Sequence, residues 1–121
     1  MAVIRNKMKF LKYSLPAVIY ALLIFYLSSI PGGDLAQLFP YQDIVFHIIE
    51  YGIFAILISR AIKGYWPGML IFKRILWTVA VVLVYAISDE FHQSFVPNRY
   101  PAVTDIAYDG IGAIASSIFY R

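Results

Sequence analysis

The chain contains no cysteine and few charged residues. The absence of cysteine among 121 residues excludes disulfides, thiolate metal ligands and cysteine nucleophiles. Charged residues make up 14% of the sequence, against about 25% in an average soluble domain, and hydrophobic residues make up 61%. No basic run is interleaved with exposed aromatics, so nucleic acid is not an expected partner. A chain of this composition cannot cover an ordinary water-facing surface.

Four apolar windows predict the fold. A helix that crosses a bilayer needs ~20 mostly apolar residues, and four stretches of the sequence fit, at about 11–30, 44–62, 75–95 and 102–120. The last is the weakest, because Asp105 and Asp109 interrupt it. The links between the windows are short and contain Pro31, Pro67 and Pro97. We therefore expect an all-α membrane protein with a single domain over residues 1–121, in which four transmembrane helices form an up-down bundle.

The basic residues predict the orientation of the bundle. Nine of the ten lie in the N-terminal tail, the middle connection or the C-terminus: Arg5, Lys7, Lys9, Lys12, Arg60, Lys63, Lys73, Arg74 and Arg121. Arg99 alone lies on the opposite side. Cytoplasmic loops of membrane proteins are enriched in Lys and Arg, so we expect both termini in the cytoplasm.

The acidic residues converge on the outer half of this predicted bundle. Of the seven, only Asp34 lies in a loop outside the apolar windows; the others are Asp43, Glu50, Asp89, Glu90, Asp105 and Asp109. With the orientation above, they fall at the outer ends of three different helices. A charge at mid-bilayer costs ~2.5–3.5 kcal/mol on insertion scales, so such residues are seldom present without a partner or a function.

Helical spacing indicates which of these side chains share a face. The second window carries a polar stripe at i, i+4 and i+7, formed by Asp43, His47 and Glu50. The fourth continues a similar stripe with small residues, formed by Asp105, Asp109, Gly112 and Ser116. Small residues let helices approach closely in lipid, so this stripe is expected to face inward. On the third window one face carries Asp89, His92 and Gln93, and Glu90 is expected to point elsewhere.

Three chemistries fit these residue types. The first is a divalent metal site for Zn²⁺ or Mn²⁺, with His47, His92 and Asp109 as ligands. The second is metal-free acid–base catalysis by clustered carboxylates and histidines, namely Asp89, His92, Asp105, Asp109, His47 and Glu50. The third is recognition or transport of a lipid headgroup, with binding groups Arg99, Gln93, Asp43 and Glu90.

Simpler interpretations stand beside these. Asp43 and Arg99 could contact headgroups at the interface, or Arg99 could pair with Asp105 or Asp109. The whole polar cluster could serve only to lock the bundle of a non-enzymatic binding or assembly protein. Transport is less favoured, because the chain is short and has no inverted repeat.

Several segments resemble one known family. The segment Ser88–Arg99, followed by Asp105, Asp109, Gly110 and Gly112, is similar to the signature of the VanZ-like family. The resemblance extends to Asp43, His47, Glu50 and Tyr51, and to Ser28–Gly32, and covers the chain from about Pro16 onward. One departure is Ile44, where many relatives carry a lysine.

The resemblance implies a multi-pass protein of the bacterial cytoplasmic membrane. The founding member of that family is associated with resistance to teicoplanin, a lipid-tailed glycopeptide antibiotic. We therefore expect a site near the outer leaflet that binds, and hydrolyses or modifies, an amphipathic envelope molecule: a lipid-linked cell-wall precursor, a phospholipid or a lipoglycopeptide. Asp89, His92, Asp105 and Asp109 are expected at its centre, with His47 and Glu50 from the second helix.

Overall fold

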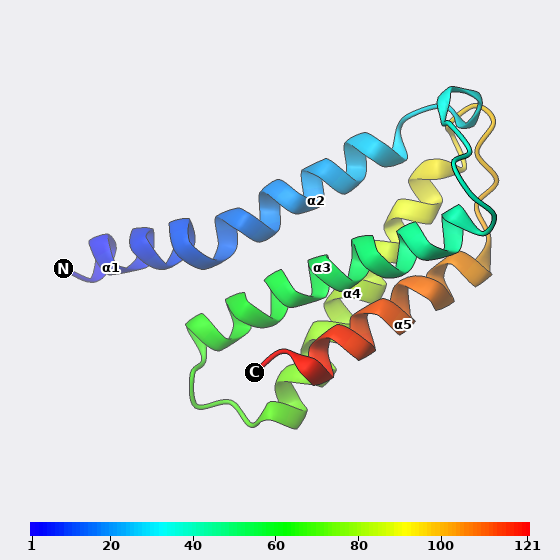
Figure 1. Ribbon diagram of the computed structural model, residues 1–121. Helices are drawn as coiled ribbons and strands as arrows, with labels where there is room; N and C mark the ends of the chain where they lie inside the picture. The colour runs from blue at the N-terminus through cyan, green and yellow to red at the C-terminus, as the bar shows by residue number, and fades with distance from the viewer.

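The computed structural model describes all residues of the chain, 1–121, and four long helical stretches account for most of them (Figure 1). The first stretch is continuous from Ala2 to Ser28 and consists of α1 (Ala2–Lys9), a π-helical turn η1 (Phe10–Ser14) and α2 (Leu15–Ser28). A 3-10 turn, η2 (Gly32–Asp34), lies in the following loop. The remaining helices are α3 (Gln42–Tyr65), α4 (Ile71–Gln93) and α5 (Val103–Phe119). The predicted all-α architecture is confirmed.

The helix ends differ from the predicted windows by up to nine residues. The first helical stretch begins at residue 2 instead of about 11, and α3 and α4 each extend beyond the apolar window at their basic ends. An apolar window measures the part of a helix that suits lipid, whereas backbone hydrogen bonding continues into polar sequence such as Lys73 and Arg74. The first stretch ends at Ser28 instead of about residue 30, shortly before Pro31.

Three of the four stretches are long and apolar enough to cross a membrane: Ala2–Ser28, Gln42–Tyr65 and Ile71–Gln93. Their outer surfaces carry large apolar side chains that a water-facing protein would bury, for example Leu22, Phe72 and Val84, each at least 64% exposed. Helix α5 has 17 residues and directs Ile111, Ile114 and Ile118 outward. Its crossing of the membrane stays a prediction.

The interior of the bundle is small and partly polar. Its apolar core joins four helices through Ile24, Tyr51, Phe54, Ala55, Val82, Ala86 and Ala113. Ser59, Thr78, Asp109 and Ser117 are fully buried beside it, at 0% exposure. This distribution, apolar outside and polar within, is the one expected for helices that associate in lipid.

Helices α3 and α5 approach each other closely because glycines line their contact. A methyl group added to Gly112 would lie 2.3 Å from the carbonyl oxygen of Ile48, and one added to Gly52 would lie 2.8 Å from Oγ of Ser116. Only glycine, whose side chain is a single hydrogen atom, permits this approach. The inward-facing small stripe predicted for the fourth window is therefore confirmed, and it brings Asp109 up against α3.

The two ends of the bundle differ in chemistry. At one end basic side chains bind backbone oxygens of neighbouring segments: Arg60 donates to Lys12, Lys63 to Arg121 and Arg74 to Tyr120. At the other end the loop after α2 meets the loop after α4, where Gly32 N–H donates to Pro97 O at 3.1 Å. Consecutive long helices run antiparallel, and α1 projects past the bundle (Figure 1). Acidic residues gather at the end that lacks the basic cluster.

Candidate functional site

A histidine–carboxylate pair links α3 to α5 at this acidic end. Nδ1 of His47 lies 2.7 Å from Oδ1 of Asp109, and the two side chains are 16% and 1% exposed. The ring N–H donates to the carboxylate, so Asp109 fixes the orientation of the imidazole. The pairing follows from the close glycine-lined contact, which places one turn of α5 against the N-terminal half of α3.

A second bond links α3 to α4. The hydroxyl of Tyr51, which is 1% exposed, donates to Oδ2 of Asp89 at 2.9 Å. Tyr51 lies one helical turn after His47, and the two rings are nearly parallel at 6.4 Å between centroids. Tyr51 was named in the sequence only as part of the family resemblance, because a tyrosine in an apolar window is most simply a lipid-facing or interfacial residue. Its spacing of i+4 from His47 is the signal that could have identified it.

Glu90 differs from the sequence expectation. It was expected to point away from the other site residues, but it is 7% exposed, and its Oε2 accepts a hydrogen bond from Ala102 N–H at 3.1 Å, at the start of α5. Helix α4 contacts both α3 and α5, so two consecutive residues can face different neighbours. Asp89 turns toward Tyr51 and Glu90 toward the N-terminus of α5.

His92 lies apart from the His47–Asp109 pair. Its ring stacks on Phe25 of α2 at 4.2 Å between centroids, and its Nε2 lies 3.3 Å from Oγ of Ser29. A carboxylate oxygen of Glu90, not a nitrogen of His92, joins His47 and Asp109 in a group whose potential ligand atoms all lie within 4.8 Å of one another. Glu90 therefore lies beside His47 and Asp109, where the sequence analysis had expected His92, and the predicted metal site stays a prediction.

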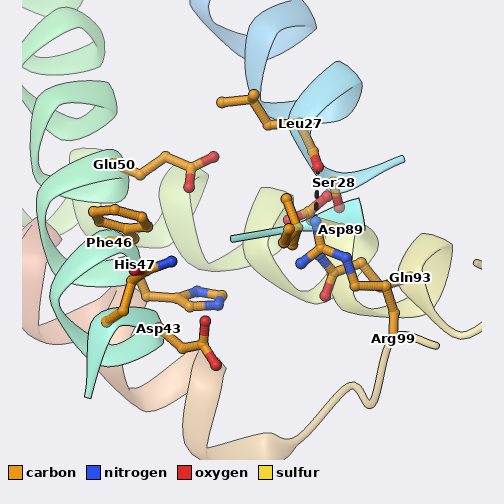
Figure 2. Close-up of a pocket in the computed structure, with 11 residues that line it drawn as sticks. Leu27, Ser28, Asp43, Phe46, His47, Glu50, Asp89, Gln93 and Arg99 are labelled. Carbon is orange, nitrogen blue, oxygen red and sulfur yellow. Dashed lines mark hydrogen bonds between the residues drawn. The ribbon is translucent and has the colours of Figure 1, made fainter. Parts of the chain in front are cut away.

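A polar cavity of about 220 Å³ lies beside this group, between α2, α3 and α4 (Figure 2). Figure 2 shows it ringed by side chains from all three helices and from Arg99 of the loop after α4; its polar and charged members are Ser28, Gln42, Asp43, His47, Glu50, Asp89, Gln93 and Arg99. Leu27, Leu35 and Phe46 supply an apolar edge. A second cavity of about 300 Å³ shares several of these residues and reaches Asp105 and Tyr100.

Arg99 closes the cavity near the end of α2. Its Nε donates to Ile30 O and its Nη2 to Leu27 O, both at 2.8 Å. Both carbonyls lie at or just beyond the C-terminal end of α2, where a cation is favourable. Arg99 forms no ion pair with Asp105 or Asp109, since the single ion pair in the structure joins His47 and Asp109. The guanidinium has five N–H donors, so most of them stay available to a ligand.

The remaining predicted residues occupy the rim. Asp43 is exposed in the first turn of α3, and Glu50 is half-buried at the cavity two turns further on. Asp105 is half-buried and lines only the second cavity. Gln93 is buried and lines both cavities. Gln42, which sequence reasoning did not select, supports the loop before α3 by accepting from Leu38 N–H and donating to Ala36 O.

A family model described as VanZ/LLP1 matches residues 13–121 of the chain. The chain belongs to the VanZ/LLP1 family. Searches of curated proteins and of solved structures return no match. The match and the long apolar helices together make this a multi-pass membrane protein of the VanZ/LLP1 family.

The segments that carry the VanZ/LLP1 resemblance meet around the cavity. Ser28–Gly32 ends α2, Asp43–Tyr51 begins α3, Ser88–Arg99 ends α4, and Asp105–Gly112 begins α5. Contacts between them include those of Arg99 with Leu27 and of His47 with Asp109. The parts of this VanZ/LLP1 protein that are most distinctive in sequence thus form one spatial unit, while the basic end of the bundle contributes little to the motif.

Proposed function

We propose that this VanZ/LLP1 protein binds the polar headgroup of an amphipathic envelope molecule in the cavity between α2, α3 and α4. The observation that carries the proposal is the cavity itself, which is lined by Asp43, His47, Glu50, Asp89 and Arg99 inside a bundle with an apolar outer surface. Charged residues within membrane helices mark ligand pathways more often than they serve packing alone.

The charges of the cavity suggest which headgroups fit. The carboxylates of Asp43, Glu50 and Asp89 accept hydrogen bonds, so they suit hydroxyl or ammonium groups. Arg99 suits a phosphate, because its planar fork can bind two oxygens at once. A headgroup that combines a phosphate with donors meets both requirements. Lipid-linked cell-wall precursors and ethanolamine phospholipids have this chemistry, and a lipoglycopeptide offers sugar hydroxyls and a carboxylate.

The acyl or polyprenyl tail is proposed to leave the cavity at its apolar edge. Leu27 and Phe46 lie there on α2 and α3, and Phe46 is 45% exposed. Helix α2 packs more loosely on α3 and α4 than these two helices pack on α5. A tail between α2 and α3 would stay in lipid while the headgroup occupies the polar space.

We place the cavity in the outer leaflet. The basic side chains of the opposite end support a cytoplasmic position for both termini and for the connection between α3 and α4. With α5 as the fourth span, the chain would be a four-helix protein of the bacterial inner membrane with its site open to the outside. That position agrees with the glycopeptide-resistance phenotype of the founding VanZ protein, because glycopeptides act on precursors outside the membrane.

A chemical step is proposed to follow binding. Asp109 holds Nδ1 of His47, so Nε2 is the ring nitrogen available to remove a proton from water. The water oxygen would bond to the phosphoryl or acyl centre of the bound molecule, and the imidazolium would return the proton to the departing oxygen. The net reaction is hydrolysis of one ester bond by one water molecule.

Binding is tested with two phospholipids, one with an ethanolammonium donor on its phosphate and one without it. The purified protein in nanodiscs should bind phosphatidylethanolamine at least about tenfold more tightly than phosphatidic acid, the preference that about 1.4 kcal/mol of hydrogen bonding provides. Glu50→Gln should reduce this preference, whereas Lys73→Gln, an exposed change at the basic end, should keep it. Equal affinity for the two lipids in the wild type, or an unchanged preference in Glu50→Gln, would contradict the proposal.

A purely structural role is the second candidate, and the bonds that cross the bundle favour it. His47–Asp109, Tyr51–Asp89 and Ala102–Glu90 join α3, α4 and α5. If their only role is to lock the helices, Asp89→Ala should lower the free energy of unfolding by ~3–5 kcal/mol, as for a broken buried pair, and the wild type should show no saturable lipid binding. A binding residue instead leaves stability near or above that of the wild type when it is removed.

A further inference from the structure

We infer that His47, Glu90 and Asp109 form a binding site for one divalent cation. Each residue offers a ligand atom, and the three atoms lie within 4.8 Å of one another. The residues come from three different helices, α3, α4 and α5, so the tertiary fold alone assembles the group. We call these three residues the triad.

Two buried oxygens of the triad have no hydrogen-bond partner in the protein, which indicates that they bind a ligand. Oδ2 of Asp109 and Oε1 of Glu90 accept no hydrogen bond from the protein, and the two residues are 0% and 7% exposed. A buried carboxylate oxygen without a partner costs roughly 1–3 kcal/mol or more. This separates the triad from an ordinary acidic cluster on a surface, where water satisfies every oxygen.

The negative charges of the triad are also not balanced by basic side chains. No lysine or arginine lies within 4.0 Å of an Asp or Glu carboxylate in the structure, and the one ion pair of such a carboxylate joins Asp109 to His47. Asp89 adds a third buried carboxylate, whose Oδ1 also lacks a hydrogen bond. Arg99, the one arginine in the wall of the cavity, donates to backbone oxygens instead. A divalent cation would balance Glu90 and Asp109 within the membrane.

The donor set defines the class of ion. One imidazole nitrogen and two carboxylate oxygens suit Mn²⁺, Fe²⁺ and Zn²⁺ better than soft, thiolate-seeking ions. Three protein ligands leave at least one coordination position for water or for an oxygen of a ligand. A cation would compete with protons for His47, so occupancy would fall as the pH is lowered, and a bound cation would keep the imidazole from acting as a base.

The triad adjoins the headgroup cavity through His47, which belongs to both. Glu90 and Asp109 do not line the cavity. An ion in the triad could therefore meet a phosphate oxygen held near Arg99. The contact between the ion and a headgroup rests on the proposed function. Cation binding itself depends on the triad alone.

The experiment measures cation binding without lipid. The protein, purified in mild detergent and stripped with chelator, is titrated with Mn²⁺ while electron paramagnetic resonance follows free and bound ion. We expect one bound Mn²⁺ per chain, with electron spin-echo modulation from one imidazole nitrogen. Glu90→Gln and Asp109→Asn should each weaken binding at least about tenfold, because changes even to the partners of metal ligands cost 10–100-fold.

Two controls make the outcome decisive. Glu50→Gln removes a carboxylate from α3 one turn after His47 but outside the triad, so it should keep one ion per chain and the nitrogen modulation. His92→Gln should also keep the modulation, because His92 stacks on Phe25 away from the triad. If His92→Gln loses the modulation and His47→Gln keeps it, the nitrogen ligand is His92 and the inference is overturned.

The wild type alone decides the case if a triad variant does not fold. Absence of bound Mn²⁺, and of Zn²⁺ measured by mass spectrometry after equilibration, would overturn the inference. So would binding without imidazole modulation. If the protein binds the cation but shows no lipid preference, the proposed function is contradicted and the cation site stands. If it shows the lipid preference but binds no cation, the cation site is contradicted and the proposed function stands.

Discussion

Nδ1 of His47 and Oδ1 of Asp109 lie 2.7 Å apart although 62 positions separate the two residues in the chain. The contact exists because Gly52 and Gly112 let α3 and α5 approach closely just below it. The strength of this pair can be measured separately from any ligand.

A double-mutant cycle should detect coupling between His47 and Asp109. We expect His47→Gln and Asp109→Asn to be non-additive in the free energy of unfolding by ~0.5–3 kcal/mol, because each single change removes the same bond. Chemical unfolding in detergent, followed by circular dichroism, gives the four free energies. Additive effects within experimental error would mean that the pair is not formed in the folded protein.

Gly112→Ala should destabilise the bundle. Its methyl group would lie 2.3 Å from Ile48 O and 3.1 Å from Gly52 N, and a backbone cannot yield as a flexible side chain does. The cost is expected at ~1–3 kcal/mol, typical of overpacking. Gly68→Ala is the matched control, because nothing lies within 4 Å of its added methyl. Equal melting temperatures for the two variants would show that α3 and α5 are not held so closely.

Arg99→Lys should loosen the loop after α2 while keeping the charge. A lysine presents a single ammonium and cannot donate to Leu27 O and Ile30 O with the fixed fork of a guanidinium. Hydrogen bonds to charged groups contribute ~1.5–3 kcal/mol, so amide exchange around Gly32 should accelerate about tenfold or more. Mass-spectrometric hydrogen exchange measures this. Lys73→Ala should leave the rates in that loop unchanged, and unchanged rates in Arg99→Lys would exclude the restraining role.

Single cysteines should report the orientation. The chain has no native cysteine, so Leu38→Cys and Gly68→Cys each introduce one thiol, at exposed positions in opposite loops. In intact spheroplasts a membrane-impermeant maleimide should label position 38, and position 68 should be labelled only after permeabilisation. The reverse pattern would put the cavity on the cytoplasmic side. That position would contradict the proposed binding of an envelope molecule from outside the membrane.

The sequence by itself determined the class of protein. Four apolar windows, the scarcity of charge and the small-residue stripe of the last window led to a helical membrane bundle, because the length and periodicity of apolar segments depend on local sequence. The convergence of acidic residues at one end also followed from the windows, since antiparallel helices with short links bring alternate ends together. The family resemblance was carried by short contiguous segments and is confirmed over residues 13–121.

The tertiary structure decided which of these acidic residues meet. Asp89 and Glu90 are consecutive, and periodicity placed only Asp89 on the face shared with His92 and Gln93, yet both are buried because α4 contacts both α3 and α5. His92 shares a helical face with Asp89 by spacing but turns to Phe25 of α2, and Tyr51 gained its role from a partner on another helix. Spacing along one helix fixes directions relative to that helix alone, and the neighbour found in each direction depends on how all the helices pack.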